Sequence, residues 1–286
     1  MLKRIIRSRE RKRRSPTPHP IHVRKIDFEF PEEIEKYWFG GSAVKTHVFN
    51  TITLLFPEGE QYFIRSVNRF RDRIEDPALQ EAIRGFMQQE MQHSMQHKKY
   101  WHNLEVQGYH YDRFLALFRF FLERVVEARC GDSLNLAITA ALEHCTAVLA
   151  QIYLEEEEAT AEAQEALRKL FAWHSIEEIE HKGVAYDVLQ EVDDRYLLRV
   201  AGMLIGFYTL VFFTFLGTGM FLVQDRTLLR GKVLRELAGF FFTKEKIFNR
   251  TFWALGKYLR PDFHPWAEDN RHLVDRALQT TLAATA

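Results

Sequence analysis

The sequence predicts an all-α protein with a four-helix bundle at its centre. Glycine and proline are sparse, at 14 and 8 of 286 residues, and such a composition favours helices over turn-rich β structure. Two Glu-x-x-His units, Glu90/His93 and Glu178/His181, have the spacing with which helices of metal-binding bundles present two ligands each. A helical stretch with one acidic residue on its uncharged face precedes each unit, so four helices are expected to carry ligands.

Residues 1–20 are expected to form a disordered basic arm. Eight lysine and arginine residues accompany one acid, Glu10, and a proline-rich stretch follows. Such an arm is typical of a solubilising tail or of a contact with an anionic membrane surface. No nucleic-acid partner is expected, because the formal net charge of the chain is zero. The arm lacks a following apolar segment, so no cleavable signal peptide is expected.

The first predicted helix covers residues 42–75 and carries the first candidate ligand. A proline is tolerated in the first turn of a helix, so Pro57 predicts a break or restart at that point. Glu60 is the lone acid on the apolar stripe that follows, and a buried charge is costly unless it is paired or bound to metal. Glu58 is a neighbour that could be mistaken for it.

The second predicted helix covers residues 76–107. Asp76 is a capping residue at its start, and Gly108 marks its end. An apolar third helix is expected over residues 111–129. The inward face of the second helix carries the candidate ligands and one further histidine: Glu90, His93 and His97.

The fourth and fifth predicted helices carry the other half of the candidate set. Glu143 lies among alanines and threonines on one face of the helix 133–154. The fifth helix is expected over about 160–192, where His174, Glu178 and His181 fall at i, i+4 and i+7 and therefore share one face. A histidine alone is more often a core residue, but this spacing makes His174 a candidate ligand.

Residues 200–224 form an uncharged run of 25 residues, which is long enough to cross a membrane. A monotopic insertion and a buried core helix fit the run as well, and arginines on both sides leave the orientation open. Residues 227–260 alternate basic and aromatic groups, as an interfacial or a packed helix would. A loop at 261–265 and a short helix at 266–283 follow.

These patterns divide the chain into the arm 1–20, a metal-binding bundle at 21–195 and a C-terminal helical region at 196–286. The two cysteines, Cys130 and Cys145, make neither a disulfide framework nor a zinc spacing and are typical of a reducing compartment. We therefore expect a cytoplasmic protein, with residues 200–224 as the segment that would attach it to the inner face of the membrane.

The candidate set favours two iron or manganese ions over zinc alone. Carboxylates that bridge and terminate a metal pair, with one histidine for each metal, are typical of such sites. Four glutamates would also neutralise two divalent ions in a buried site, whereas without metal they would repel one another.

The motifs together resemble two groups of proteins. The set resembles the ferritin-like di-iron carboxylate superfamily, and His174-x-x-x-Glu178-x-x-His181 resembles the pattern of di-iron arylamine N-oxygenases. The chain is also similar to a bacterial family of predicted metal-dependent hydrolases, over roughly residues 45–260. The motifs that carry this similarity are residues 56–63, 89–97, 141–144 and 173–182. The resemblance implies a ferritin-like bundle with these metal ligands: Glu60, Glu90, His93, Glu143, His174, Glu178 and His181.

Three other residues in or beside the motifs are expected to have other roles. His97 and Glu177 are expected to orient ligands through hydrogen bonds, and His97 could instead bind a metal directly, mirroring His174. His144 projects at a different angle from Glu143 and is expected to be a core histidine away from the metals.

Three functions fit this set. The first is an oxidase or oxygenase with two irons, which would use O₂ and an electron donor on a small apolar or lipid-like substrate. The alternative is a metal-dependent hydrolase that uses a metal-activated water. The third is an iron-binding bundle without turnover. The all-helical, glutamate-rich set favours the first, and the sequence leaves the substrate and the oligomeric state open.

Overall fold

The computed structural model describes residues 20–244 and 247–282, and its regular elements there are all helical, which confirms the all-α prediction. A single β-bridge joins Phe39 to Ala163. The predicted basic arm lies outside the described residues apart from Pro20. The α-helices are α2 (Ala43–Asn68), α3 (Pro77–Val106), α4 (Asp112–Phe120), α5 (Asp132–Glu155), α6 (Glu157–Thr160), α7 (Glu165–His181), α8 (Val184–Val192), α9 (Tyr196–Gln224), α10 (Gly231–Ala238), α11 (Ile247–Tyr258) and α12 (Arg271–Thr280).

Short segments of other helix types join some of these helices. Two have π-helical geometry, namely η2 (Phe121–Glu127), which continues α4, and η3 (Gly239–Thr243), which continues α10. Two have 3₁₀ geometry, namely η1 (Arg71–Arg73) and η4 (Pro265–Ala267). The predicted third helix at 111–129 therefore consists of α4 and the π-helical segment η2 that continues it.

The first helix does not break at Pro57, so that prediction was wrong. Helix α2 runs through the proline without interruption. A proline has no N–H, and the carbonyl of Thr53, four residues earlier, therefore lacks its usual helical partner. The indole Nε1 of Trp101 on α3 donates a hydrogen bond of 3.1 Å to that carbonyl. The lost backbone bond is thus replaced from a neighbouring helix, which the local sequence does not reveal.

The predicted fifth helix at 160–192 begins later, at Glu165 after an interruption that follows α6, and is divided into α7 and α8. The segment between α6 and α7 bonds to the N-terminal part of the chain, where the backbone N–H of Gln164 donates to the carbonyl of Trp38. A second interruption follows α7 at Gly183. A Cβ at Gly183 would lie 2.8 Å from the indole Nε1 of Trp266, so this close approach favours glycine. The interruption falls after His181 and leaves the ligand-bearing turn intact.

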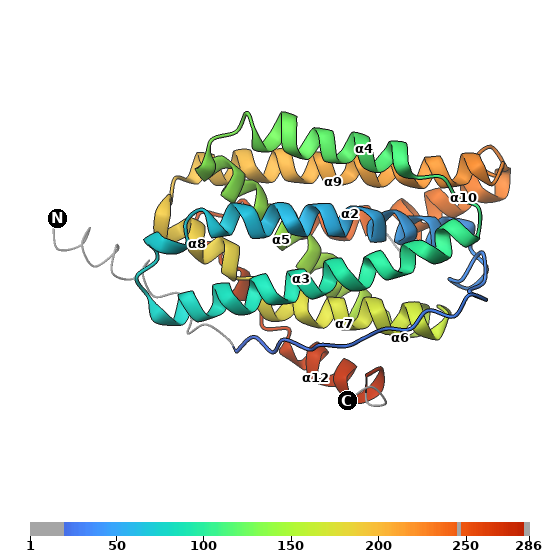
Figure 1. Cartoon of the computed structure of the whole chain (residues 1–286), viewed down its shortest axis with the longest axis horizontal. Coiled ribbons are helices and arrows are strands. Elements are labelled where there is room, and N and C mark those ends of the chain that lie inside the picture. The colour runs from blue at the N-terminus through green and yellow to red at the C-terminus, as the bar shows by residue number, and fades with distance from the viewer. Residues whose placement is uncertain (1–19, 245–246, 283–286) are drawn as a thin grey trace.

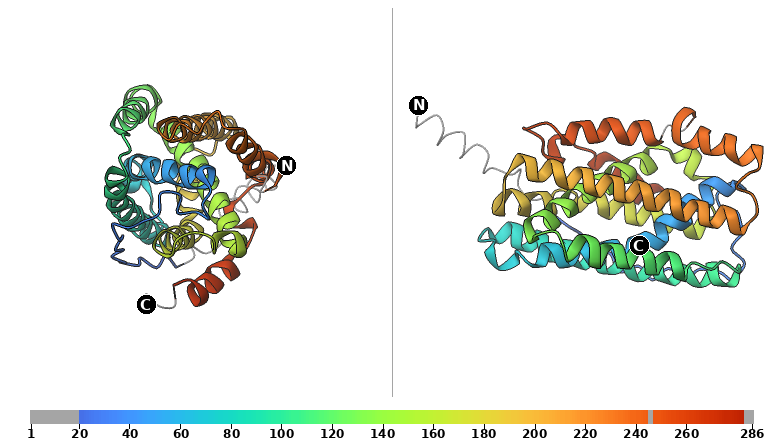
Figure 2. Two further views of the ribbon diagram at one scale, coloured as in Figure 1. Left: turned by 90° about the vertical axis from the view of Figure 1, so that its right-hand side faces the viewer. Right: turned by 90° about the horizontal axis from the view of Figure 1, so that it is seen from above.

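The long helices run along the long axis of the molecule (Figure 1). Helices α2, α3, α5 and α7 surround the interior in which the candidate ligands lie. Helices α4 and α9, together with η3 and α11, form a second layer over α2 and α5 (Figure 2). Aromatic contacts join this layer, including Phe118 to Phe213 and Phe207 to Phe248, with ring centroids 4.8 and 6.2 Å apart.

Two of the described helices, α5 and α9, are long and apolar enough to cross a membrane by length and composition. They differ in burial, because 83% of the most apolar window of α5 lies inside the protein but only 28% of that of α9. Helix α5 is therefore a core helix. Helix α9 buries one side against α5 and α2 and leaves the other side exposed.

Candidate metal centre

The structure brings all seven predicted ligands into one buried cluster. Glu60 comes from α2, Glu143 comes from α5, and none of the seven residues is more than 3% exposed. Helix α3 supplies Glu90 and His93, and α7 supplies His174, Glu178 and His181. Each helix therefore presents its ligands on its inward face, as the spacings of three, four and seven residues predict.

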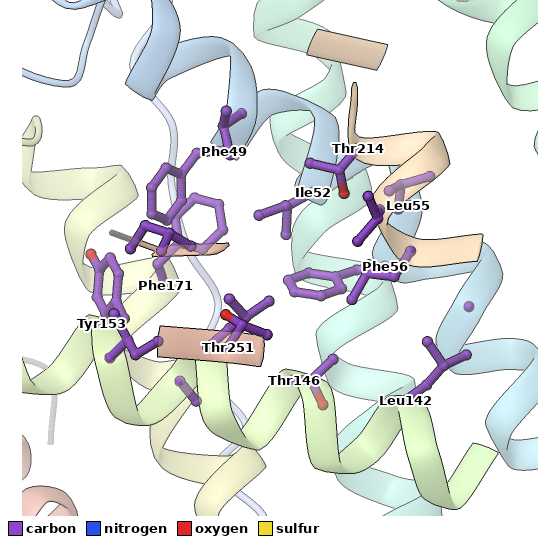
Figure 3. Close-up of a pocket in the computed structure, with 18 of the residues that line it drawn as sticks. Phe49, Ile52, Leu55, Phe56, Leu142, Thr146, Tyr153, Phe171, Thr214 and Thr251 are labelled. Carbon is purple, nitrogen blue, oxygen red and sulfur yellow. The ribbon is translucent and has the colours of Figure 1, made fainter. Parts of the chain in front are cut away.

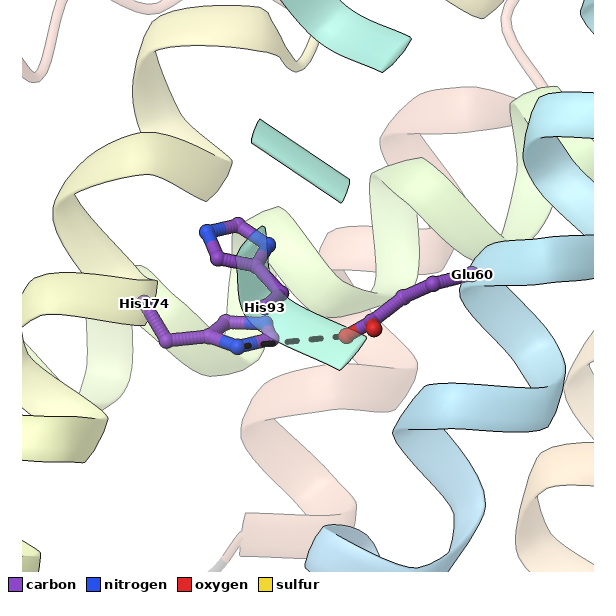
Figure 4. Close-up of side chains that lie close together, drawn as sticks. All are labelled: Glu60, His93 and His174. Carbon is purple, nitrogen blue, oxygen red and sulfur yellow. Dashed lines mark ion pairs between the residues drawn. The ribbon is translucent and has the colours of Figure 1, made fainter. Parts of the chain in front are cut away.

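Three overlapping groups of ligand atoms could each hold a metal ion. Within each group the atoms lie within 4.8 Å of one another. One group lies at the junction of α2, α3 and α7, where Figure 4 shows His174 and Glu60 facing each other beside the ring of His93. The groups are Glu60/His93/His174, Glu90/His93/Glu178 and Glu90/Glu143/His181. Shared members make the cluster continuous, which suits two neighbouring ions.

The polar atoms at the centre of the cluster make no hydrogen bond of normal geometry within the described residues. Both carboxylate oxygens of Glu90 and of Glu143 are in this state, and so is Nε2 of His181, although this nitrogen lies 3.2 Å from an oxygen of Glu90 and 3.3 Å from one of Glu143. Leaving a buried polar atom unpaired costs about 1–3 kcal/mol, and more when the group is charged. Several such atoms facing one another are therefore better explained as ligands of divalent cations than as a packed core. The donor set of carboxylates and imidazoles fits iron or manganese.

The pKa values of the cluster without metal also indicate a cation-binding site. Burial, with the neighbouring Glu90 carboxylate, raises the pKa of Glu143 to about 8. The same two causes raise the pKa of Glu60 well above its usual range. Burial would lower the pKa of His93, but the carboxylates of Glu177 and Glu90 outweigh it and raise this pKa to about 10. Without metal the cluster thus holds protons that bound cations would displace.

Polar groups behind two of the candidate histidines fix the orientation of their rings. His181 Nδ1 lies 2.9 Å from Oε1 of Gln89, so its Nε2 is left for the cluster. His93 Nε2 lies 3.1 Å from a carboxylate oxygen of Glu177, which leaves Nδ1 for a metal. A carboxylate or amide behind a histidine in this way sets its tautomer and raises its basicity as a ligand.

His97 supports His174 and does not face the cluster itself. Its Nε2 lies 2.9 Å from Nδ1 of His174, and its Nδ1 lies 3.2 Å from the hydroxyl of Thr53. Both ring nitrogens of His97 are therefore engaged. This geometry favours the orienting role that the sequence suggests for His97 over direct binding.

An apolar cavity of about 220 Å³ leads to one side of the cluster. Three of the seven ligands line it, namely Glu60, His174 and Glu178. Figure 3 shows side chains of α2, α5, α7 and α9 around the space, most of them aliphatic or aromatic. A dry apolar cavity of roughly 150 Å³ already admits benzene, so this one has room for an aromatic ring or a short alkyl chain.

A comparison with known protein families agrees with this geometry. The model of a family described as a predicted metal-dependent hydrolase matches residues 22–269. The chain belongs to this family. No curated protein and no solved structure matches the chain. Membership supports a metal-dependent enzyme, and the hydrolase in the family's description is the alternative reading drawn from the sequence. A ferritin-like relationship stays a prediction.

Several residues of the site were not assigned a role from the sequence. Gln89 orients His181, the hydroxyl of Thr146 donates to Glu178, and the hydroxyl of Ser94 donates to Glu60 over 2.7 Å. Arg24 donates to Glu177 from its backbone N–H over 2.9 Å. The first three lie within four residues of a ligand on the same helix, a proximity that could have indicated them. Nothing in the sequence points to Arg24.

Two residues that resemble ligands lie away from the cluster. His144 packs its ring on Tyr258, with centroids 5.2 Å apart, and burial lowers the pKa of His144 to about 4. It is the core histidine that the sequence predicts. Glu58 forms an ion pair with Arg119 at 2.7 Å. Of the two neighbouring glutamates, Glu58 and Glu60, it is therefore Glu60 that points into the cluster.

Proposed function

We propose that the protein is an enzyme with two metals, an oxidase or oxygenase that acts on a small apolar substrate. The observation that carries the proposal is the apolar cavity that ends on Glu60, His174 and Glu178. A cavity with such walls favours an aromatic or alkyl group over a polar one. The seven buried carboxylate and imidazole side chains would hold two ions, for which iron is the proposed metal.

Bound iron would supply activation of O₂ beside the inner end of the cavity. The side chains that line the cavity would hold the substrate there and exclude bulk water. Insertion of one oxygen atom into a C–H bond releases the other as water and consumes two electrons and two protons. An external electron donor must therefore act as the co-reactant, and a small redox protein is the class that fits.

A metal-dependent hydrolase is the second candidate, and the family description favours it. In that case the metals would lower the pKa of a bound water, and the cavity would hold the acyl or alkyl part of an ester. Two features of the site favour an oxidase or oxygenase over a hydrolase. The ligands are all on helices and rich in glutamate, and the cavity walls near them offer few polar groups for a leaving alcohol or acid.

The test is reconstitution of the full chain with Fe²⁺ without oxygen, followed by exposure to O₂ and an electron donor. We expect about two irons per chain and O₂ consumption that increases with alkyl or aromatic compounds. Zinc or manganese in the purified protein, no response to O₂ and hydrolysis of an aliphatic ester would overturn the oxygenase and favour the hydrolase.

A cavity variant connects the activity to this site. Thr214 on α9 lines the cavity (Figure 3). Thr214→Phe should fill part of the space and reduce turnover of the larger substrates, with the metal content unchanged. Thr214→Val has nearly the same volume and is the matched control, which should retain turnover. Equal substrate ranges for both variants would show that the cavity is not the substrate site.

A further inference from the structure

Helix α9 has two faces of opposite character. The inner face places Gly202, Gly206 and Gly217 against α5 and α2, where added Cβ atoms would meet side-chain or backbone atoms of those helices. The outer face carries large apolar side chains at helical spacing, and they are exposed. They are Leu204, Tyr208, Phe212, Phe215 and Leu216. A helix with this pattern packs on one side and needs an apolar partner on the other.

The neighbouring helices extend the exposed apolar surface on both sides of α9. Helix α4 adds Leu117 and Phe120, and η3 and α11 add Phe242, Phe252 and Trp253. Trp253 is 77% exposed. These helices lie side by side (Figure 2), and ring contacts run from Phe215 through Phe241, Phe242 and Phe248 to Phe252. The exposed apolar residues named in this paragraph and the one before it are called here the apolar face. Contiguous exposed apolar side chains are typical of a surface that contacts a protein or a membrane.

The apolar face is connected to the cavity through one residue. Phe215 is 41% exposed and also lines the cavity. Its ring packs against that of Phe241, another lining residue, with centroids 4.7 Å apart. An apolar compound that reaches the face from outside would therefore meet the wall of the cavity that leads to Glu60 and His174.

We propose that the apolar face docks on an anionic lipid bilayer, with α9 lying in the plane of the membrane surface. Residues 225–260 contain nine lysine and arginine residues and three acids. Arg250, Lys257 and Arg260 pair with acids outside this range. Arg226, Arg230 and Arg235 are exposed and form no ion pair within the described residues, so they can attract anionic headgroups. Tyr208 and Trp253 are residue types that favour the boundary between headgroups and acyl chains. Helix α9 packs on the bundle at Gly202, Gly206 and Gly217, near both of its ends, so insertion of one face fits better than a span. This proposal does not depend on the reaction at the metal cluster.

The first test is co-sedimentation of the full chain with vesicles of phosphatidylcholine, with and without phosphatidylglycerol. The wild-type chain should bind the anionic vesicles and bind the neutral ones more weakly. The double variant Phe212→Glu/Trp253→Glu should reduce the partition coefficient by roughly a hundredfold, since each large apolar side chain contributes about tenfold on burial. Met95→Glu, on the exposed face of α3, is the matched control and should bind as wild type does.

Results of two kinds would overturn the proposal, one from sedimentation and one from the oligomeric state. One is a wild-type chain that stays in the supernatant with anionic vesicles, or a double variant that sediments as wild type does. The other is a wild-type dimer in solution that the double variant converts to monomer without any vesicle binding, because a second copy would then cover the face. Neither Phe212 nor Trp253 lines the cavity, so metal content should be the same in all variants.

A second measurement needs no charged substitution and therefore remains decisive if the double variant does not fold. Lipids brominated on their acyl chains quench an indole that enters the bilayer. Vesicles of such lipids should quench part of the tryptophan fluorescence of the wild-type chain, and Trp253→Phe should lose that part. Absence of quenching in the wild type would contradict docking through this face.

Discussion

The packing of α9 on α5 can be tested with three glycine-to-alanine substitutions, because the glycines have very different surroundings. A Cβ at Gly202 would lie 2.5 Å from the backbone carbonyl carbon and oxygen of Ala137. Backbone atoms cannot rotate away, so the two helices would have to separate. A Cβ at Gly206 would lie 3.2 Å from Cγ of Leu142, a side chain that can shift. Apart from the neighbouring turns of α9 itself, no atom of the described residues lies within 4 Å of the position at Gly219.

These distances predict the order of the three variants in their free energy of unfolding. Alanine is better than glycine inside a helix by about 1 kcal/mol, so Gly219→Ala should raise the free energy of unfolding by up to that amount. Overpacking costs about 1–3 kcal/mol and the same helix gain offsets part of it, so Gly202→Ala should fall by up to about 2 kcal/mol below wild type. Gly206→Ala should fall between the two. The helix gain is common to the outer pair, so these two variants should differ by the overpacking cost, which at about 2–4 °C per kcal/mol is roughly 2–12 °C in Tm.

The assay is urea and thermal unfolding followed by far-ultraviolet circular dichroism, with all three variants in the same buffer and metal state. The reasoning is refuted if Gly202→Ala is as stable as Gly219→Ala. Such a result would mean that α9 does not lie against α5 at this point, and an α9 that leaves the bundle would be free to span a bilayer.

Four further predictions concern the metal cluster and the core. Glu143→Ala and Glu178→Ala should each lose at least one metal per chain by elemental analysis, and unchanged metal content in both would show that the ligands are assigned wrongly. Gln89→Leu should weaken metal retention by roughly 10–100-fold in competition with a chelator, because His181 loses the partner that orients its ring. Removal of metal should lower the Tm of the wild-type chain, since the unpaired carboxylates then remain buried together; an unchanged Tm would separate metal binding from folding. Burial lowers the pKa of His144 from 6.5 to about 4, so the stability it contributes is complete above pH 6.5 and falls by up to about 3 kcal/mol towards pH 4. His144→Gln should flatten this part of the curve of unfolding free energy against pH, and a curve equal to that of wild type would place the acid sensitivity elsewhere.

The clustering of the seven candidate ligands could be predicted from the sequence because the information that it needs is local. Residues three, four and seven apart share a helix face whatever the tertiary structure is, so α7 had to present His174, Glu178 and His181 together. A lone acid on an uncharged face also indicates Glu60 and Glu143 without any knowledge of their partners. The structure places these five side chains, with those from α3, in one buried cluster.

The predictions that failed depend on partners distant in sequence. The helix through Pro57 is possible because Trp101 donates to the carbonyl that the proline leaves unpaired. The break after α7 coincides with the approach of Trp266 to Gly183, and 83 residues separate the two. No periodic pattern in the sequence predicts these two tryptophan contacts, because each of them arises when segments that are far apart in the chain pack together.

The two halves of the ligand set are similar in sequence but not equivalent in the structure. Each half has a lone glutamate and a Glu-x-x-His unit, and each has one extra histidine, His97 or His174. Only His174 lines the cavity, since His97 is held behind it by Thr53. A metal bound near His174 and Glu60 would therefore lie beside the cavity, whereas one bound near Glu143 would lie deeper. Substrate would reach the pair from one side, so the chemistry is expected at the position formed by Glu60, His93 and His174, which draws its side chains from both halves of the set.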